Sequence, residues 1–284
     1  MYYICEDDKP KYWLEKFNIV KLQGNRIILP IKEKYQSKEK QVKKENKLYK
    51  KTKKIIDKAN SKKVILSKRV QNLKTYVNNI QSLELDIVNG KWLFFMLIPE
   101  ILEYIIKKEK TKKQDIDIHI LVNDINDNTI KLIKIISKTY KNVYIVTKHI
   151  EKLKKIEEQI LEENGTIIMI MNNKKKSLAK AKIIVNIDFP QELINQYIIY
   201  EKAIIIDCYE NIIINKKRFN GVIIQDYDID IKDINKYILE NEKYYRKELY
   251  EAEFYKKQPY ENIRDKIQKD GIKINKLLST NQTY

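Results

Sequence analysis

Five apolar segments alternate with helix-length amphipathic stretches between residues 117 and 208, and this alternation restricts the possible folds more than any other feature. The segments are DIHILVN (117–123), NVYIVT (142–147), TIIMIMN (166–172), KIIVNID (182–188) and KAIIIDC (202–208). Strands that are apolar along their whole length are typical of parallel sheets covered on both faces, and the helices between them supply the crossovers. We therefore predict an α/β fold with a parallel sheet of at least four strands and helices on both of its faces.

The flanking residues predict a smaller α/β unit before this sheet and a helical tail after it. FNIVKLQGNRIILPI (17–31) has two apolar runs around Gly24-Asn25, which predicts a hairpin. KVILS (63–67) and LELDIV (83–88) alternate with helical patterns. The predicted domains are residues 1–110, with the hairpin, a basic helix and a small βαβα unit; residues 111–230, a Rossmann-like domain; and residues 231–284, the helical tail.

Residues 33–59 predict a long basic helix, because they lack Gly and Pro and repeat an apolar residue every seven positions. The stripe is Tyr35, Val42, Tyr49 and Ile56, with Leu48 and Ile55 beside it. Residues 31–70 hold sixteen Lys/Arg and four Asp/Glu, which is two thirds of the net charge of +18. One hypothesis is that residues 33–63 dock on nucleic acid or an anionic membrane, with contacts from Lys43, Lys44, Lys47, Lys50 and Lys51. A solvated helix that packs on its own domain is the alternative.

Composition excludes several classes of protein. The two cysteines, Cys5 and Cys208, are far apart, so no disulfide framework or zinc ribbon is expected and a cytoplasmic location is favoured. The first ten residues lack the pattern of a signal peptide. The apolar run WLFFMLI (92–98) is shorter than the ~20 residues of a membrane span, so it predicts a buried helix that Pro99 kinks. No cluster of His, Cys and acidic residues has metal-ligand spacing, so no metal is expected.

Lysine dominates the basic residues, since only five of the 57 are arginine. Ile, Asn and Tyr are also abundant, and these are residues that AT-rich codons encode. Codon bias could therefore account for part of the charge. Reading of base edges relies on the arginine fork, which lysine does not reproduce.

Three stretches of the second block carry a family pattern. They are NVYIVTKHIEKLKKIEEQILEENG (142–165), AKAKIIVNIDFP (179–190) and EKAIIIDCYE (201–210). In order and spacing, residues 117–210 resemble the NAD(P)-binding domain of the shikimate dehydrogenase and glutamyl-tRNA reductase type. The resemblance implies a Rossmann-like domain, and it does not extend to residues 1–110.

The loop after the first strand of this block departs from the family pattern. The family's loop is rich in glycine, so that the backbone can approach the pyrophosphate at a helix N-terminus. Here residues 123–128 are NDINDN, and Asn126 or Asp127 is well placed to cap the helix. A cap would take the N–H groups that a phosphate needs, and the aspartates would repel the phosphate. We therefore expect no dinucleotide cofactor, or NADP if any is bound.

The candidate ligand contacts lie at the ends of two strands. Asn123 and Asp124 are in the departing loop, and Thr147 and Lys148 form the turn where NADP-dependent members of the family place a basic residue against the ribose 2′-phosphate. No catalytic residue can be assigned. Other candidates are Asp188 and Asp207, which either contact a ligand or cap a turn; Lys68 and residues 173–176, NKKK, as anion contacts; and His119, which is predicted to be a core residue.

The favoured function is that of a non-catalytic pseudo-dehydrogenase, which acts as a regulatory or interaction module for an unidentified protein partner. An NADP-dependent reductase or dehydrogenase is the first alternative, and is the expected activity if the protein is an enzyme. A polyanion-docking module that uses residues 33–63 is the second.

Overall fold

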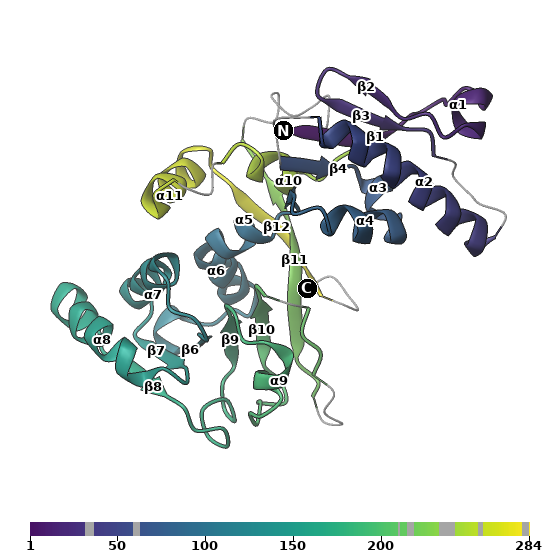
Figure 1. Ribbon diagram of the computed structural model, residues 1–284. Coiled ribbons are helices and arrows are strands. Elements are labelled where there is room, and N and C mark those ends of the chain that lie inside the picture. The colour runs from purple at the N-terminus through teal and green to yellow at the C-terminus, as the bar shows by residue number, and fades with distance from the viewer. Residues whose placement is uncertain are drawn as a thin grey trace. The chain divides into compact units, whose positions relative to one another are not determined.

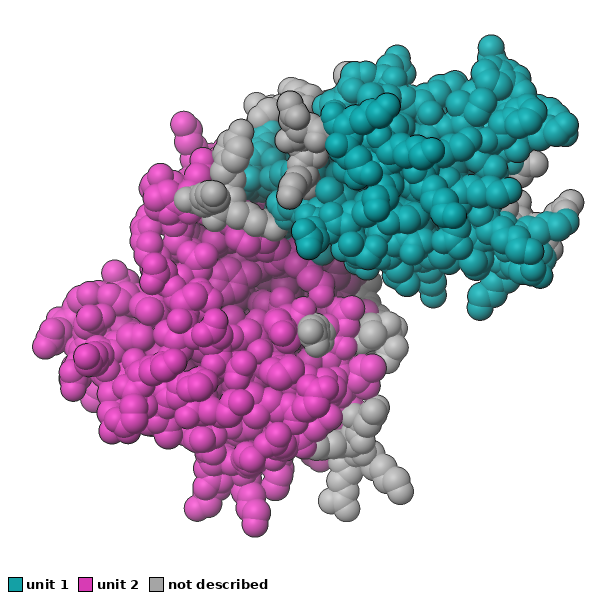
Figure 2. Space-filling view, viewed as in Figure 1, with its two compact units in different colours: residues 1–90, 233–256 teal, residues 91–232, 257–284 magenta. Residues whose placement is uncertain are grey.

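The computed structural model describes residues 1–31, 37–58, 63–209, 211–214, 219–232, 242–254, 258–279 and 284 (Figure 1). The chain forms two compact units, each made of two separate stretches of sequence (Figure 2). Unit 1 comprises residues 1–90 and 233–256, and unit 2 comprises residues 91–232 and 257–284. Both units are α/β, which confirms the predicted fold class. The domains predicted from the sequence, residues 1–110, 111–230 and 231–284, have different bounds from these two units. That domain division stays a prediction.

Unit 1 contains a five-stranded sheet in the order β2-β3-β1-β4-β5. The strands are β1 (Tyr2–Glu6), β2 (Lys21–Gln23), β3 (Arg26–Leu29), β4 (Lys63–Leu66) and β5 (Asp86–Val88). β1 pairs in parallel with β3 and β4, and β4 pairs in parallel with β5. β2 and β3 form an antiparallel hairpin whose turn contains Gly24 at a φ of 59°, a left-handed conformation that favours glycine.

The helices of unit 1 are α1 (Tyr12–Lys16), α2 (Lys38–Ile56), α3 (Lys68–Gln71), α4 (Lys74–Gln81) and α10 (Arg246–Glu251). Four of them pack on this sheet through two apolar clusters, one with residues of α2, α3 and α4 and the other with Leu249 of α10. Ile4 and Val64 of the strands meet Leu48 of α2 and Tyr76 of α4 in the first of these clusters. Burial of these side chains is the main stabilising term of the unit.

Helix α2 begins after Ser37, whose hydroxyl accepts a hydrogen bond from the N–H of Lys40 at 3.3 Å. Its buried residues are Glu45, Leu48, Thr52 and Ile56. The predicted stripe is therefore displaced around the helix: Leu48 and Ile56 are buried as expected, whereas Val42, Tyr49 and Ile55 are only partly buried, and Tyr35 lies outside the described residues. The periodicity favoured apolar positions, but two polar side chains with buried partners occupy the centre of the contact.

Unit 2 contains a seven-stranded sheet in the order β12-β11-β10-β9-β6-β7-β8. The strands are β6 (Asp117–Leu121), β7 (Asn142–Val146), β8 (Ile168–Met171), β9 (Ile183–Asn186), β10 (Ile204–Asp207), β11 (Val222–Asp230) and β12 (Lys273–Ser279). The first six are parallel, and β12 runs antiparallel to β11. Starting from β6, the order is that of a doubly wound, Rossmann-like sheet. The predicted parallel sheet is confirmed.

The centre of this sheet is covered on both faces. Neighbouring residues of a strand point to opposite faces, and Ile120 and Leu121 of β6 are both 0% exposed. Leu121 belongs to a core cluster with Leu178 and Phe189, which follow β8 and β9. The described helices are α5 (Lys91–Met96), α6 (Ile98–Lys108), α7 (Asp127–Thr139), α8 (Ile150–Asn164), α9 (Gln191–Ile194) and α11 (Tyr260–Lys269), with a 3-10 turn η1 (Lys113–Asp115).

Two details qualify the sequence predictions. The buried helix expected over residues 91–108 is two helices, α5 and α6, which meet at Leu97, and Pro99 stands in the first turn of α6. The tail predicted to be helical contains α10 and α11 and also the strand β12, whose sequence KINKLLS is too polar to indicate an edge strand by itself.

Candidate functional site

Strands β6 and β9 define the switch point of the unit 2 sheet, because the chain leaves β6 toward β7 and leaves β9 toward β10. In open α/β sheets ligands bind beyond the carboxyl ends of such strands. The loop of residues 122–126 follows β6, and Ile187 and Asp188 follow β9.

The Asp188 carboxylate occupies this point. The backbone N–H groups of Asn123 and Asp124 donate to its two oxygens, each at 2.6 Å. The side chain of Asn126 caps α7 by accepting from the N–H of Thr129 at 3.0 Å. Two side chains of the protein thus accept N–H groups that a bound phosphate would use.

Asp188 therefore does not act as the cap of the turn that follows it, which was one of its two predicted roles. The N-cap position of α9 is held by Pro190, which makes no side-chain hydrogen bond. Burial raises the pKa of the Asp188 carboxyl, the two backbone N–H groups and His149 lower it, and Asp124 raises it. An anionic ligand would meet two carboxyl groups here, which disfavours anion binding at neutral pH.

Thr147 and Lys148 lie at the end of β7, the strand next to β6. The buried hydroxyl of Thr147 accepts a hydrogen bond from the N–H of His149 at 3.1 Å, and Lys148 is exposed. The structure thus brings Asn123 and Asp124 to the switch point and places Thr147 and Lys148 at the neighbouring strand end. A ligand contact by any of the four stays a prediction.

Asp207 is the acidic residue that acts as a local cap. Its carboxylate accepts from the N–H of Ile212 at 2.8 Å and from the side-chain amide of Asn186 at 2.9 Å. Asn186 also bonds both backbone groups of Phe189. These buried partners hold the ends of β9 and β10 together and leave Asp207 little capacity for a ligand.

His119 lies in β6 and is 7% exposed, as expected for a core residue. Its ring stacks on Tyr144 with centroids 4.5 Å apart, but its buried Nδ1 has no hydrogen-bond partner among the described residues. Burial lowers the pKa of His119 to about 4, against smaller raising effects of Asp117 and the Ser177 backbone. The imidazole is therefore neutral at pH 7. Across the described ranges, no group of three His, Cys, Asp or Glu residues could hold a metal ion.

The two other predicted anion contacts are engaged within the chain. Lys68 donates to the carbonyl of Glu242 at 3.3 Å, and its ammonium group lies 5.3 Å from the ring centre of Tyr245. Asn173 accepts the N–H groups of Lys175 and Lys176, each at 3.0 Å, so the NKKK segment forms a turn closed on its own side chain.

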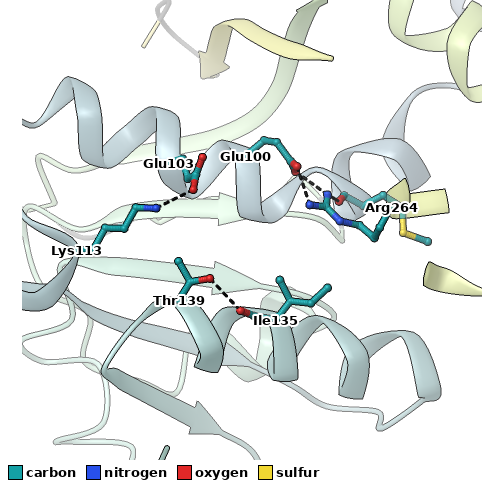
Figure 3. A network of polar contacts seen from close by, with 7 residues as sticks. Glu100, Glu103, Lys113, Ile135, Thr139 and Arg264 are labelled. Carbon is teal, nitrogen blue, oxygen red and sulfur yellow. Dashed lines mark hydrogen bonds and ion pairs between the residues drawn. The ribbon is translucent and has the colours of Figure 1, made fainter. Parts of the chain in front are cut away.

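Among the described residues of unit 2, the most buried ion pair joins α11 to α6 (Figure 3). Arg264 donates two hydrogen bonds to Glu100, at 2.6 and 2.7 Å, and one to the carbonyl of Met96 at 2.7 Å. On the same helix as Glu100, Glu103 accepts from Lys113 at 2.7 Å. This network fastens α11 to the body of the unit and has a structural role.

Unit 1 presents a basic surface on α2. We define the lysine face as seven lysines that lie outside the buried row of the helix: Lys40, Lys43, Lys44, Lys47, Lys50, Lys51 and Lys54. All are exposed except Lys44, whose side chain is 15% exposed and pairs with Glu15 at 3.2 Å. Lys43 pairs with Glu39, and Lys51 donates to the carbonyl of Phe17. Within the described residues, Lys47, Lys50 and Lys54 have no acidic partner.

Sequence reasoning missed the aromatic side chains next to this face. We define the aromatic cluster as Tyr12, Trp13, Phe17 and Leu22, which are 73%, 50%, 60% and 51% exposed. Three of them belong to YWLEKF (12–17), a stretch with basic residues on both sides. That combination is typical of aromatic residues at interfaces, and it is a signal that hydrophobic periodicity does not carry.

Comparisons with known proteins do not assign this chain to a family. The sequence matches no protein-family model and no curated protein. Similar solved structures include an ornithine carbamoyltransferase from Pyrococcus furiosus, with 13% identity, a TM-score of 0.30 and coverage of 76% of this chain and 74% of that one. An aspartate transcarbamoylase from Trypanosoma cruzi has 13% identity, a TM-score of 0.26 and coverage of 74% and 72%. A mitochondrial ornithine carbamoyltransferase from Coccidioides immitis has 12% identity, a TM-score of 0.28 and coverage of 61% and 59%.

The neighbours correct the family prediction, because they are carbamoyltransferases and not NAD(P) domains of the shikimate dehydrogenase type. The resemblance over residues 117–210 was wrong as a statement of family: strand order and spacing are shared by many doubly wound sheets. The pseudo-dehydrogenase module, the NADP-dependent reductase and NADP as a cofactor fall with it. A TM-score near 0.3 carries no activity from these neighbours to this chain.

Proposed function

We propose that unit 1 binds a polyanion, a partner with closely spaced phosphate or sulfate groups, through the lysine face of α2. A cytoplasmic location belongs to this proposal. In the described parts of the chain, no helix combines the length and apolar character that crossing a bilayer requires.

The observation that supports the proposal is the excess of lysine on the outward side of α2. The helix carries nine lysines and two glutamates. One of the glutamates, Glu45, is buried and accepts from the backbone N–H of Tyr76 at 3.0 Å, so it does not offset the surface charge nearby. Lysines three and four residues apart repel each other on a helix, and a polyanion relieves that repulsion while its counterions are released.

The geometry narrows the predicted contacts. Lys44 and Lys51 are engaged with α1, through Glu15 and the carbonyl of Phe17. Lys43, Lys47, Lys50 and Lys54 are exposed and lie three or four residues apart, so they form one row along the helix. Lys43 pairs with Glu39 of the same helix, but both side chains of that pair are exposed, so Lys43 stays accessible to a partner. These four are the contacts that the proposal assigns.

The test is heparin binding by the full chain at several salt concentrations, with a variant in which these four lysines are changed to glutamine. Binding should weaken steeply with salt, at a slope of about 0.7–0.9 in log K per contacted charge. The variant should lose most of its affinity at low salt, and its slope should fall by about 3. Glutamine keeps the length and helix propensity of the side chain, so the fold should persist.

A matched control carries the same loss of charge in unit 2, with Lys138, Lys152, Lys154 and Lys155 changed to glutamine. All four are exposed and lie on α7 or α8. The control should bind heparin nearly as well as the parent. Equal losses in both variants would show that net charge alone attracts heparin, and the proposal would be abandoned.

A further inference from the structure

Three members of the aromatic cluster flank a buried residue of α1. Leu14, in the middle of α1, is 1% exposed and anchors the helix, while Tyr12, Trp13 and Phe17 point into solvent. Leu22 adds an exposed aliphatic side chain from β2. Large apolar side chains gathered on a surface indicate an interaction site more strongly than single exposed ones.

Polar contacts join this cluster to the lysine face. Glu15 of α1 pairs with Lys44 at 3.2 Å, and the carbonyl of Phe17 accepts from Lys51 at 2.6 Å. On the cluster itself, the Lys16 ammonium group lies 6.0 Å from the ring centre of Tyr12 and 5.9 Å from that of Phe17. The aromatic residues of α1 and the lysines of α2 therefore lie on adjoining helices, and together they form a candidate docking surface.

We infer that this surface docks on an anionic lipid membrane: the aromatic cluster enters the interface and the lysine face contacts the headgroup phosphates. The inference rests on the proposed function and names its partner. Amphipathic aromatic rings prefer the level of the headgroups, and nearby lysines are attracted to anionic lipids. Among the nearby acidic side chains, Asp7 pairs with Lys21, Glu15 with Lys44 and Glu39 with Lys43, which reduces their repulsion of an anionic surface. Asp57, the exposed C-cap residue of α2, follows the last contact lysine.

A single-stranded nucleic acid fits the same surface less well. Bases stack on the faces of aromatic rings, and here Lys16 lies over two of those rings. Leu22 has no face for stacking, but it is suited to insertion among lipid chains. Described residues of the surface include no arginine, which readers of base edges favour.

The experiment uses the fluorescence of Trp13 in the full chain. The chain has two tryptophans, so Trp92→Phe makes Trp13 the sole reporter. On addition of phosphatidylcholine vesicles that contain phosphatidylserine, the emission should shift to the blue and be quenched by lipids brominated on their acyl chains. Vesicles of phosphatidylcholine alone should leave the emission unchanged, since the lysine face then has no net charge to meet.

A variant separates the membrane from other polyanions. Changing Tyr12, Trp13 and Phe17 to serine should lower vesicle cosedimentation by about tenfold or more and leave heparin binding intact. The matched control changes Ile167, Ile198 and Ile213 to serine; they are 63%, 51% and 57% exposed and belong to unit 2. The control should cosediment with vesicles like the parent.

The outcomes distinguish the two proposals. Trp13 emission that stays unshifted with vesicles, while heparin binding persists in the parent, would overturn the membrane inference and leave polyanion binding standing. Trp13 quenched by single-stranded oligothymidine and not by brominated lipid would overturn it in favour of nucleic acid. If the parent protein does not bind heparin, the proposed function is wrong as well.

Discussion

Helices α2 and α8 meet the same structural demand with different surfaces. Each is amphipathic and buries one side in the core of its unit, but α2 carries nine lysines and two glutamates, whereas α8 carries three lysines and five glutamates. Codon bias acts on both helices alike, so it does not account for the difference. The unbalanced charge of α2 is the feature from which the proposed polyanion binding is argued.

Three ion pairs of unit 2 fasten its own helices. Lys134 of α7 pairs with Glu163 of α8 at 2.8 Å, and Lys131 of α7 pairs with Glu261 of α11 at 3.0 Å. The Arg264–Glu100 pair joins α11 to α6. These pairs join helices within unit 2, whereas all but one of the lysines of α2 are exposed.

The prediction with the largest expected effect removes one of these ion pairs. Arg264→Met leaves Glu100 partly buried without its partner, and should lower the free energy of unfolding of unit 2 by about 2–4 kcal/mol. Trp92 lies in unit 2 and Trp13 in unit 1, so urea unfolding of single-tryptophan variants follows each unit separately. The double change Arg264→Met, Glu100→Gln should recover about half of the loss. An unchanged Trp92 transition in Arg264→Met would mean that the pair does not hold unit 2 together.

A smaller effect concerns the buried imidazole of unit 2. The pKa of His119 falls from 6.5 to about 4 in the folded state, mainly through burial. As pH falls, the unfolded chain binds this proton near pH 6.5, whereas the folded chain binds it only near pH 4. His119 therefore contributes stability above about pH 6.5, and that contribution is lost as pH falls through about 4. His119→Phe keeps an aromatic ring against Tyr144. On acidification, its free energy of unfolding should fall by about 2–4 kcal/mol less than that of the parent.

Urea unfolding at pH 7 and pH 4.5, followed through Trp92, checks this expectation. When pH falls from 7 to 4.5, the free energy of unfolding should decrease more for the parent than for His119→Phe. A difference that is the same at both pH values would show that His119 is protonated as easily in the folded state as in the unfolded one.

The smallest effect concerns stability on α2. With Lys43, Lys47, Lys50 and Lys54 changed to glutamine, repulsion between lysines three and four residues apart is removed, and unit 1 should gain about 0.5–1 kcal/mol at low salt. The gain should vanish in ~1 M salt, where exposed charges are screened. Urea unfolding followed through Trp13 measures it. A loss of stability instead would mean that these lysines support the fold, and the contrast with α8 would weaken.

The elements with a strong periodic signal were predictable from sequence. The parallel sheet of unit 2 follows from five apolar segments separated by amphipathic stretches, since only burial on both faces accommodates such strands. The Asn126 cap of α7 is likewise local, because it spans three residues. The strand β12 was missed because its polar residues give no apolar alternation, and its pairing with β11 lies beyond any sequence window.

What the sequence determined by itself, then, is the local chemistry: apolar strands, amphipathic helices, a loop without glycine and a helix crowded with lysine. Tertiary structure alone decided that Asp188 accepts the N–H groups of Asn123 and Asp124, whose positions are 65 and 64 residues away along the chain. It also decided that an exposed aromatic cluster lies beside the lysine face, where Phe17 and Lys51 meet across 34 residues. Side-chain periodicity records which face is buried, but partners that are distant in sequence come together only when sheets and helices pack.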